Sequence, residues 1–101
     1  MKNEINEDFL KKLYAVIQKR AKGKNKNSYT KTLIKKGKNT IAQKIGEEAS
    51  ELIIEYLNGT KKRTTEEACD LIYHMLVLLY SKKITVGEIN KELIRRRNVR
   101  Q

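Results

Sequence analysis

The sequence predicts an all-α protein, and three observations support this fold class. Leu, Ile, Ala, Lys and Glu dominate the 101 residues, a composition that favours helix over strand. Proline, which interrupts helices, is absent. No segment alternates apolar and polar residues as a strand does. We therefore expect one domain, residues 1–101, formed by a bundle of four main helices plus a short one. Because so short a chain forms a small core, dimerisation is expected to complete it.

The first two helices are expected at about residues 7–21 and 28–36. Asn6 is the expected cap of the first helix, in which apolar residues from Phe9 to Ile17 recur at helical spacing. A basic loop follows at residues 22–27, where glycine and asparagine stop the helix. Ser28 is the expected cap of the short second helix, and Gly37 is its expected stop.

Three longer helices are expected at about residues 39–57, at about 62–81 and from Thr85 onward. Asn58 and Gly59 end the first of these, and the spacing of Thr85 and Glu88 forms a capping box for the last. The helix at 39–57 carries an apolar stripe that is expected to face the core: Ile41, Ile45, Leu52 and Tyr56.

The charge is strongly positive and unevenly distributed. The formal net charge is +11, and residues 9–46 include twelve lysines or arginines but no acid. This predicts a polyanionic partner, such as nucleic acid, a nucleotide phosphate or an acidic surface. The single cysteine, Cys69, fits a reducing compartment. Without a signal peptide or a long apolar run, we expect a cytoplasmic protein with no membrane partner.

Two groups of carboxylates stand out against this basic background. At about 100° per residue, Glu47, Glu48 and Glu51 fall, with Lys44 and Glu55, within one arc beside the apolar stripe. On the later helix, Glu67, Asp70 and His74 also share a stripe. The two groups can meet when these helices pack together. Crowded carboxylates are costly unless a cation binds them, and Mg²⁺ prefers such oxygen ligands.

Each of these residues also has a purely structural explanation. Glutamate pairs on helices are usually solvated, and Thr64 and Glu67 are spaced as a capping box. A lone histidine such as His74 is more often a hydrogen-bonded core residue than a catalyst. Cys69 fits a small core position, and Lys44 can simply neutralise Glu48 one turn away.

Three motifs carry a resemblance to a known family. They are Ser-Tyr-Thr at residues 28–30, Ile-Ala-Gln-Lys-Ile-Gly-Glu-Glu at 41–48 and Asp-Leu-Ile-Tyr-His at 70–74. Together with the acidic signature Glu-Glu-x-x-Glu and Glu-x-x-Asp, they make residues 9–96 resemble the phosphoribosyl-ATP pyrophosphohydrolases of histidine biosynthesis. These enzymes are all-α, MazG-like nucleotide pyrophosphatases. Thr40 departs from the pattern, since a basic residue is expected there, although Lys36 or Lys38 could take over its phosphate contact.

The resemblance implies hydrolysis of phosphoribosyl-ATP to phosphoribosyl-AMP and pyrophosphate, with Mg²⁺ as cofactor and a homodimer as the assembly. It implies that Glu48, Glu51, Glu67 and Asp70 hold the metal. Glu47 and Glu48 are the implied catalytic residues, with Glu47 either a further ligand or the group that orients or deprotonates the attacking water. The implied substrate-binding residues are Lys44, Lys36, Lys38, Tyr73 and His74.

Three other functions stay open at this point. A MazG-like enzyme that removes non-standard or excess nucleoside triphosphates would use the same metal ligands. A small basic nucleic-acid-binding protein fits the charge, but few aromatic residues, no docking motif and the acidic stripe argue against it. A structural helical interaction module is the third possibility.

Overall fold

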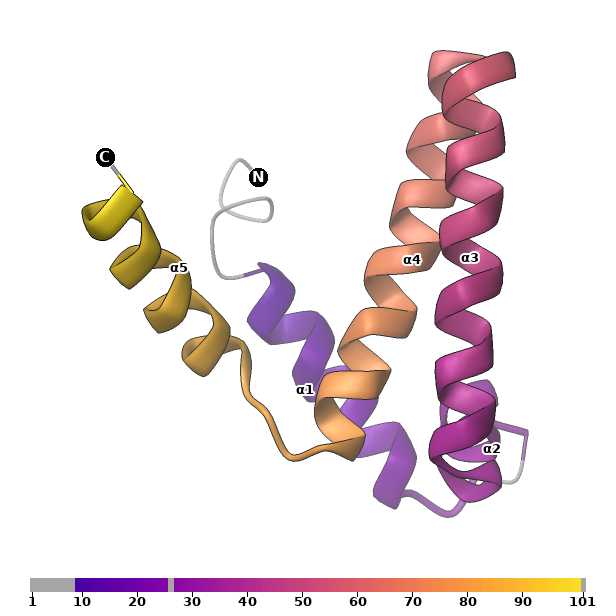
Figure 1. The fold of residues 1–101 in the computed structure, drawn as a ribbon. Helices are drawn as coiled ribbons and strands as arrows, with labels where there is room; N and C mark the ends of the chain where they lie inside the picture. The colour runs from indigo at the N-terminus through magenta and orange to yellow at the C-terminus, as the bar shows by residue number, and fades with distance from the viewer. Residues whose placement is uncertain (1–8, 26, 101) are drawn as a thin grey trace, which may run out of the picture.

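The structure, a computed structural model, describes residues 9–25 and 27–100, and within these it contains helices and no strand (Figure 1). The predicted all-α fold is therefore confirmed, and every predicted helix is present. The expected cap at Asn6 lies outside the described residues. The helices are α1 (Phe9–Lys22), α2 (Tyr29–Lys36), α3 (Lys38–Asn58), α4 (Lys61–Ser81) and α5 (Val86–Arg100).

The predicted caps of α2 and α5 are confirmed. The Ser28 hydroxyl oxygen accepts the backbone N–H of Lys31 at 3.1 Å. Gly37 ends α2 with a φ of 100°, a conformation that glycine tolerates better than residues with a Cβ. At α5, the Thr85 hydroxyl accepts the N–H of Glu88 at 3.1 Å. The Glu88 carboxylate accepts the Thr85 N–H at 3.4 Å, which completes the capping box.

The start of α4 excludes one structural explanation of Glu67. Thr60 caps this helix, because its hydroxyl oxygen accepts the backbone N–H of Arg63 at 3.1 Å. The helix therefore begins before Thr64, and the alternative that Thr64 and Glu67 form a capping box is wrong. Glu67 lies within the second turn of α4 and is buried, so its carboxylate needs another explanation.

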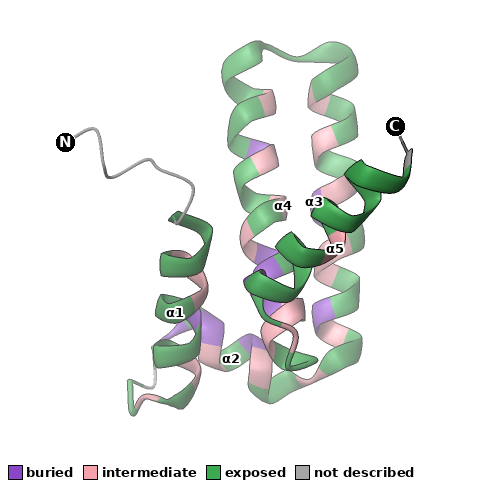
Figure 2. Cartoon of the chain, turned by 90° about the vertical axis from the view of Figure 1, so that its left-hand side faces the viewer, coloured by how far each residue is buried: buried purple, intermediate pink, exposed green. Residues whose placement is uncertain are grey.

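The buried core lies at the lower end of the molecule in Figures 1 and 2. There α1, α2, the open end of the α3–α4 hairpin and the start of α5 meet. Residues that are far apart in sequence supply it, which fixes the two long helices against α1 and α2. Its fully apolar members are Ile17, Leu33, Ile41, Leu76, Val77 and Val86.

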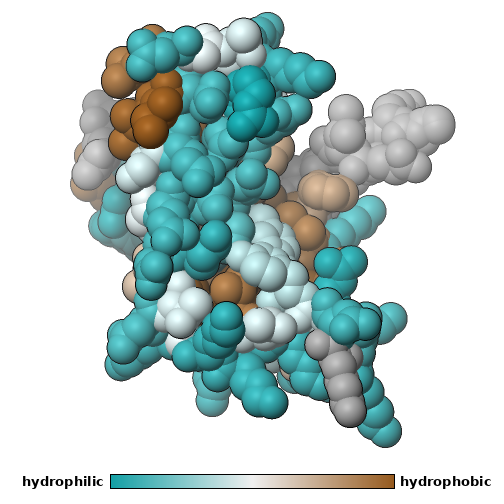
Figure 3. Space-filling model, turned by 90° about the vertical axis from the view of Figure 1, so that its right-hand side faces the viewer, coloured by the Kyte–Doolittle hydropathy of each residue, from teal (hydrophilic) through white to brown (hydrophobic). Residues whose placement is uncertain are grey.

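The upper half of the α3–α4 hairpin has no such core. Figure 1 shows only these two helices there, while α5 projects away from the hairpin. The predicted apolar stripe of α3 is therefore wrong at one position: Ile41 is buried, but Tyr56 is 75% exposed. Ile53, Ile54 and Leu57 are also exposed near the C-terminal end of α3. Figure 3 shows hydrophobic surface near the upper end of an otherwise mainly hydrophilic face.

Among the described residues, no helix is both long enough and apolar enough to cross a membrane.

Candidate active site

Carboxylates from α3 and α4 converge in the middle of the hairpin. One oxygen each from Glu48, Glu67 and Asp70 can be chosen so that the three atoms lie within 4.8 Å of one another. Glu48 and Glu67 are buried, whereas Asp70 is exposed, so the group opens to solvent on one side. Because α3 packs along α4, the helical phase predicted from the sequence brings the two acidic stripes together. The structure thus juxtaposes three of the four predicted metal ligands.

The buried carboxylates have oxygens without partners. Within the described residues, neither Oε1 of Glu48 nor Oε1 of Glu67 has a hydrogen-bond partner. A buried, unpaired carboxylate oxygen is unfavourable, because burial removes its hydration. A hard divalent cation is the ligand that suits such a set, since it binds carboxylate oxygens and neutralises their charge. The residues present therefore fit a magnesium-type ion.

Glu51 lies at the edge of this group. The negative charge of Glu48 raises the pKa of the Glu51 carboxyl, and the carboxyl group of Glu67 raises it further. Neighbouring negative charges make it harder for a carboxyl group to lose its proton, and this raises its pKa. Glu51 therefore belongs to the same crowded acidic region, one turn along α3 from Glu48.

Glu47 faces a different environment. Its carboxylate accepts a hydrogen bond from the Gln43 side-chain amide at 2.9 Å and lies 3.4 Å from the Lys44 ammonium. These two contacts lower the pKa of Glu47, in contrast to that of Glu51. Glu47 is not among the three converging carboxylates. Its predicted role as ligand or base stays a prediction, and the structure gives it a place beside Lys44.

Lys44 links the acidic group to the aromatic residues next to it. Its ammonium is 3.5 Å from Glu48, which confirms the expected neutralisation, and it also contacts Glu47. Burial lowers the pKa of Lys44, but the electrostatic interaction with Tyr29 and the hydrogen bond and negative charges of Glu47 and Glu48 outweigh burial and raise the pKa overall. The lysine therefore stays charged beside the carboxylates, where a phosphate would meet it.

His74 is buried and forms two hydrogen bonds, as the structural explanation expected. Its Nδ1 lies 2.7 Å from the backbone carbonyl of Asp70, and a carbonyl oxygen can only accept, so Nδ1–H is the donor. In the neutral ring, Nε2 then accepts the Tyr29 hydroxyl at 2.9 Å. His74 thereby joins a predicted metal ligand to Tyr29, a residue of the Ser-Tyr-Thr motif for which the sequence predicts no role.

Arg63 is a second residue that sequence reasoning missed. Its guanidinium donates to Oε2 of Glu67 at 2.8 Å, contacts Glu66 and lies 4.0 Å from Glu55. Glu67 is therefore held through one oxygen while its other oxygen stays free for a cation. The i, i+4 spacing of Arg63 and Glu67 was the signal that could have indicated this pair.

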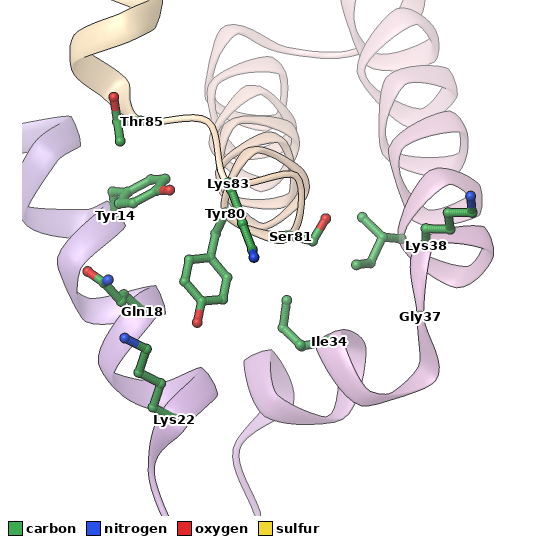
Figure 4. A pocket seen from close by; sticks show the side chains of 11 residues that line it. Tyr14, Gln18, Lys22, Ile34, Gly37, Lys38, Tyr80, Ser81, Lys83 and Thr85 are labelled. Atoms are coloured by element: carbon green, nitrogen blue, oxygen red, sulfur yellow. The ribbon is translucent and has the colours of Figure 1, made fainter.

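Two predicted phosphate-binding lysines lie elsewhere. Lys38 lines a hollow of about 730 Å³ between α1, the α2–α3 junction and the end of α4 (Figure 4). Lys83 and Tyr80 also line this hollow (Figure 4). Lys36 lines a separate hollow with Lys31 and other residues of α2. Lys38 precedes Glu48 by about three turns of α3, or about 15 Å. Neither lysine lies beside the carboxylates, so their substrate contacts stay predictions.

The expectation for Cys69 is wrong. This residue is exposed rather than part of the core. The reason is its helical phase: the neighbouring position Ala68 turns toward the interior, and Cys69 lies on the solvent side of α4.

Comparisons with known proteins agree on one family. The family described as phosphoribosyl-ATP pyrophosphohydrolase matches residues 10–97. The chain is 45% identical over 92 residues to the phosphoribosyl-ATP pyrophosphatase of Sulfolobus acidocaldarius, covering 91% of this chain and 97% of that protein. It is 45% identical over 89 residues to the enzyme of the same name from Pyrobaculum islandicum, covering 88% and 95%.

A longer relative also matches. The chain is 49% identical over 92 residues to the histidine biosynthesis bifunctional protein HisIE of Bacteroides thetaiotaomicron. The match covers 91% of this chain but 45% of that protein, so the similarity concerns less than half of the bifunctional relative.

Proposed function

The chain belongs to the phosphoribosyl-ATP pyrophosphohydrolase family, and on this premise we propose that it hydrolyses phosphoribosyl-ATP to phosphoribosyl-AMP and pyrophosphate in histidine biosynthesis. The family match across residues 10–97 is the observation that carries this conclusion. In this reaction, water adds across the anhydride bond between the α and β phosphoryl groups. The bond breaks, pyrophosphate leaves and a proton from the water is released.

We propose that the carboxylates of Glu48, Glu51, Glu67 and Asp70 hold Mg²⁺. The unpaired oxygens of Glu48 and Glu67 support this assignment. Mg²⁺ held by these carboxylates would neutralise charge on phosphate oxygens and would make an attacking water more acidic. Arg63 fixes the orientation of the Glu67 carboxylate through its hydrogen bond. The His74 ring bonds to the backbone carbonyl of Asp70 and so holds this turn of α4 in place.

The residues around the carboxylates have separate proposed tasks. Lys44 offsets the negative charge of the phosphates, since its ammonium already lies beside Glu48. Glu47 is exposed next to Lys44 and is proposed to accept a proton from the attacking water or to orient that water. Tyr73 and His74 are proposed to shape the substrate pocket. We also propose a cytoplasmic location, based on the single cysteine and its expected reducing compartment.

A substrate panel tests the proposed function. With Mg²⁺, we expect pyrophosphate release from phosphoribosyl-ATP with a kcat/KM at least a hundredfold above that for any standard or non-standard deoxynucleoside triphosphate. The physical reason is that only phosphoribosyl-ATP offers a second ribose and phosphate for additional contacts. Coupled detection of pyrophosphate measures the rates. Faster turnover of a deoxynucleoside triphosphate would instead support the nucleotide-removing MazG-like activity.

We propose that the protein forms a homodimer. The exposed apolar side chains at the upper end of the hairpin support this, among them Ile53, Ile54 and Leu57. A second copy would remove them from water, and a core of so few buried residues benefits from the added burial. We expect sedimentation equilibrium to give twice the 11.8 kDa chain mass at micromolar concentration. A mass of one chain at these concentrations would contradict the proposal.

A further inference from the structure

A third hollow lies beside Tyr29. It has a volume of about 270 Å³ and lies between the end of α1, the loop before α2, and α4. None of the described residues that line it carries an acidic side chain, and the side chain of Arg20 supplies positive charge. Its lining consists of Arg20, Asn25, Asn27, Ser28, Tyr29, Thr30 and Tyr73.

The aromatic wall of this hollow is held by hydrogen bonds. The hydroxyl of Tyr29 is bonded to His74, and that of Tyr73 to Thr30. The two tyrosine rings are nearly parallel, with an interplanar angle of 24° and centroids 6.2 Å apart. Side chains fixed in this way already hold their positions before any ligand binds, so little conformational entropy is lost when one does.

Tyr29 joins this hollow to the catalytic carboxylates. Its hydroxyl donates to Nε2 of His74 at 2.9 Å, and Nδ1–H of His74 donates to the backbone carbonyl of Asp70 at 2.7 Å. Tyr29 also lines the hollow. One molecule that extends past Tyr29 can therefore reach both the carboxylate group and Arg20.

We propose that this hollow binds the phosphoribosyl group of the substrate, with Arg20 as the partner of its phosphate. The inference rests on the proposed function, because phosphoribosyl-ATP carries a second ribose phosphate in addition to its triphosphate. The guanidinium can donate paired hydrogen bonds to a phosphate. The side chains of Asn25 and Asn27 offer donors and acceptors for ribose hydroxyls, and the tyrosine wall suits the apolar face of the sugar.

This arrangement explains how the enzyme would distinguish its substrate from ATP. The carboxylate group and Lys44 interact with the triphosphate, which both molecules share. The hollow at Arg20 interacts only with the added ribose phosphate. Specificity then arises from a group remote from the bond that breaks, through binding energy that ATP cannot supply.

The kinetic test compares Arg20→Gln with Lys19→Gln. Both substitutions remove one positive charge from neighbouring exposed positions of α1, but Lys19 does not line the hollow. We expect Arg20→Gln to raise KM for phosphoribosyl-ATP about tenfold, with kcat changed less than about twofold, because a charge-assisted contact is lost. Lys19→Gln should change KM less than about twofold, and Arg20→Lys should restore part of the loss. Residual turnover of ATP should be equal in wild type and Arg20→Gln.

Equal KM increases in Arg20→Gln and Lys19→Gln would overturn the proposal, because they would reflect bulk charge alone. A loss of kcat without a change in KM in Arg20→Gln would also overturn it.

A binding test separates this inference from the proposed function. Ribose 5-phosphate is titrated into isotope-labelled protein without metal, and backbone amide shifts are followed by NMR. We expect shifts at Asn25, Asn27 and Tyr29 in the wild type and in Lys19→Gln, but at least tenfold weaker binding in Arg20→Gln. Unshifted amides in a protein that hydrolyses phosphoribosyl-ATP would overturn the subsite alone. Failure of the wild type to hydrolyse phosphoribosyl-ATP would instead overturn the proposed function.

Discussion

Glu48→Gln and Asp70→Asn should each lower kcat for pyrophosphate release from phosphoribosyl-ATP by about a hundredfold or more. Each substitution keeps the size of the side chain but removes one negative charge from the converging carboxylates. A hundredfold loss corresponds to about 2.7 kcal/mol of transition-state stabilisation, which is within what one metal ligand supplies. Steady-state rates at saturating Mg²⁺, followed through released pyrophosphate, measure the effect.

Glu92→Gln is the matched control for these two variants. Glu92 is a helical glutamate on α5 that pairs with Arg95 at 2.7 Å and Arg96 at 3.1 Å and has no contact with the acidic group. Its loss should change kcat less than about twofold. Circular dichroism should show the wild-type helix content in all three variants, so that loss of rate reports chemistry. Full turnover by both Glu48→Gln and Asp70→Asn would remove them from the metal site.

Much of the fold could be predicted from the sequence, because its helices have local signals at their ends. Ser28, Gly37 and the pair Thr85–Glu88 act within one turn of the positions that they cap, so spacing alone reveals them. The convergence of Glu48 with α4 could also be predicted, since it follows from helical phase. Helical phase does not predict which side chains from other helices become neighbours once the helices have packed.

The features that were missed depend on such neighbours. Tyr29 reaches His74 across 45 positions of sequence, and no local pattern encodes that contact. Glu47 and Glu51 share one arc of α3, yet Gln43 and Lys44 hold the first while Glu48 and Glu67 crowd the second. The exposure of Tyr56 depends on whether a third helix covers the hairpin. Helix periodicity predicts which face is apolar but not what covers it.

Mg²⁺ should strongly increase the free energy of unfolding of the wild-type protein, and Glu51→Gln should make this increase smaller. At a concentration of a hundred times its Kd, an ion that binds only the folded protein adds about 2.7 kcal/mol. For a domain of this size, this corresponds to a rise in Tm on the order of 10 °C. Calorimetry at fixed protein concentration, with Mg²⁺ or with chelator, measures both values. Glu47→Gln is the control, and it should keep the full Mg²⁺-induced rise in Tm because Gln43 and Lys44 already hold the Glu47 carboxylate.

Without metal, the two variants should also differ in Tm, and here Glu51→Gln should be the more stable of the two. The pKa of Glu51 is raised in the folded protein, so the folded state binds this proton more tightly than the unfolded state does. The associated stability is fully present below the ordinary carboxyl pKa of 4.5 and is lost as pH rises through the higher folded value. At pH 7 without metal, Glu51→Gln should therefore raise Tm, because it removes a charge that Glu48 repels.

Glu47→Gln should have the reverse effect. The pKa of Glu47 is lowered by Gln43 and then by Lys44, so its charged form contributes stability at neutral pH that is lost as pH falls. Without metal at pH 7, this variant should lower Tm. A lower Tm for metal-free Glu51→Gln, together with an undiminished Mg²⁺ effect, would mean that Glu51 is an ordinary surface glutamate. The signs of these two Tm changes therefore distinguish Glu51, whose charge needs a bound cation, from Glu47, whose charge Lys44 already neutralises.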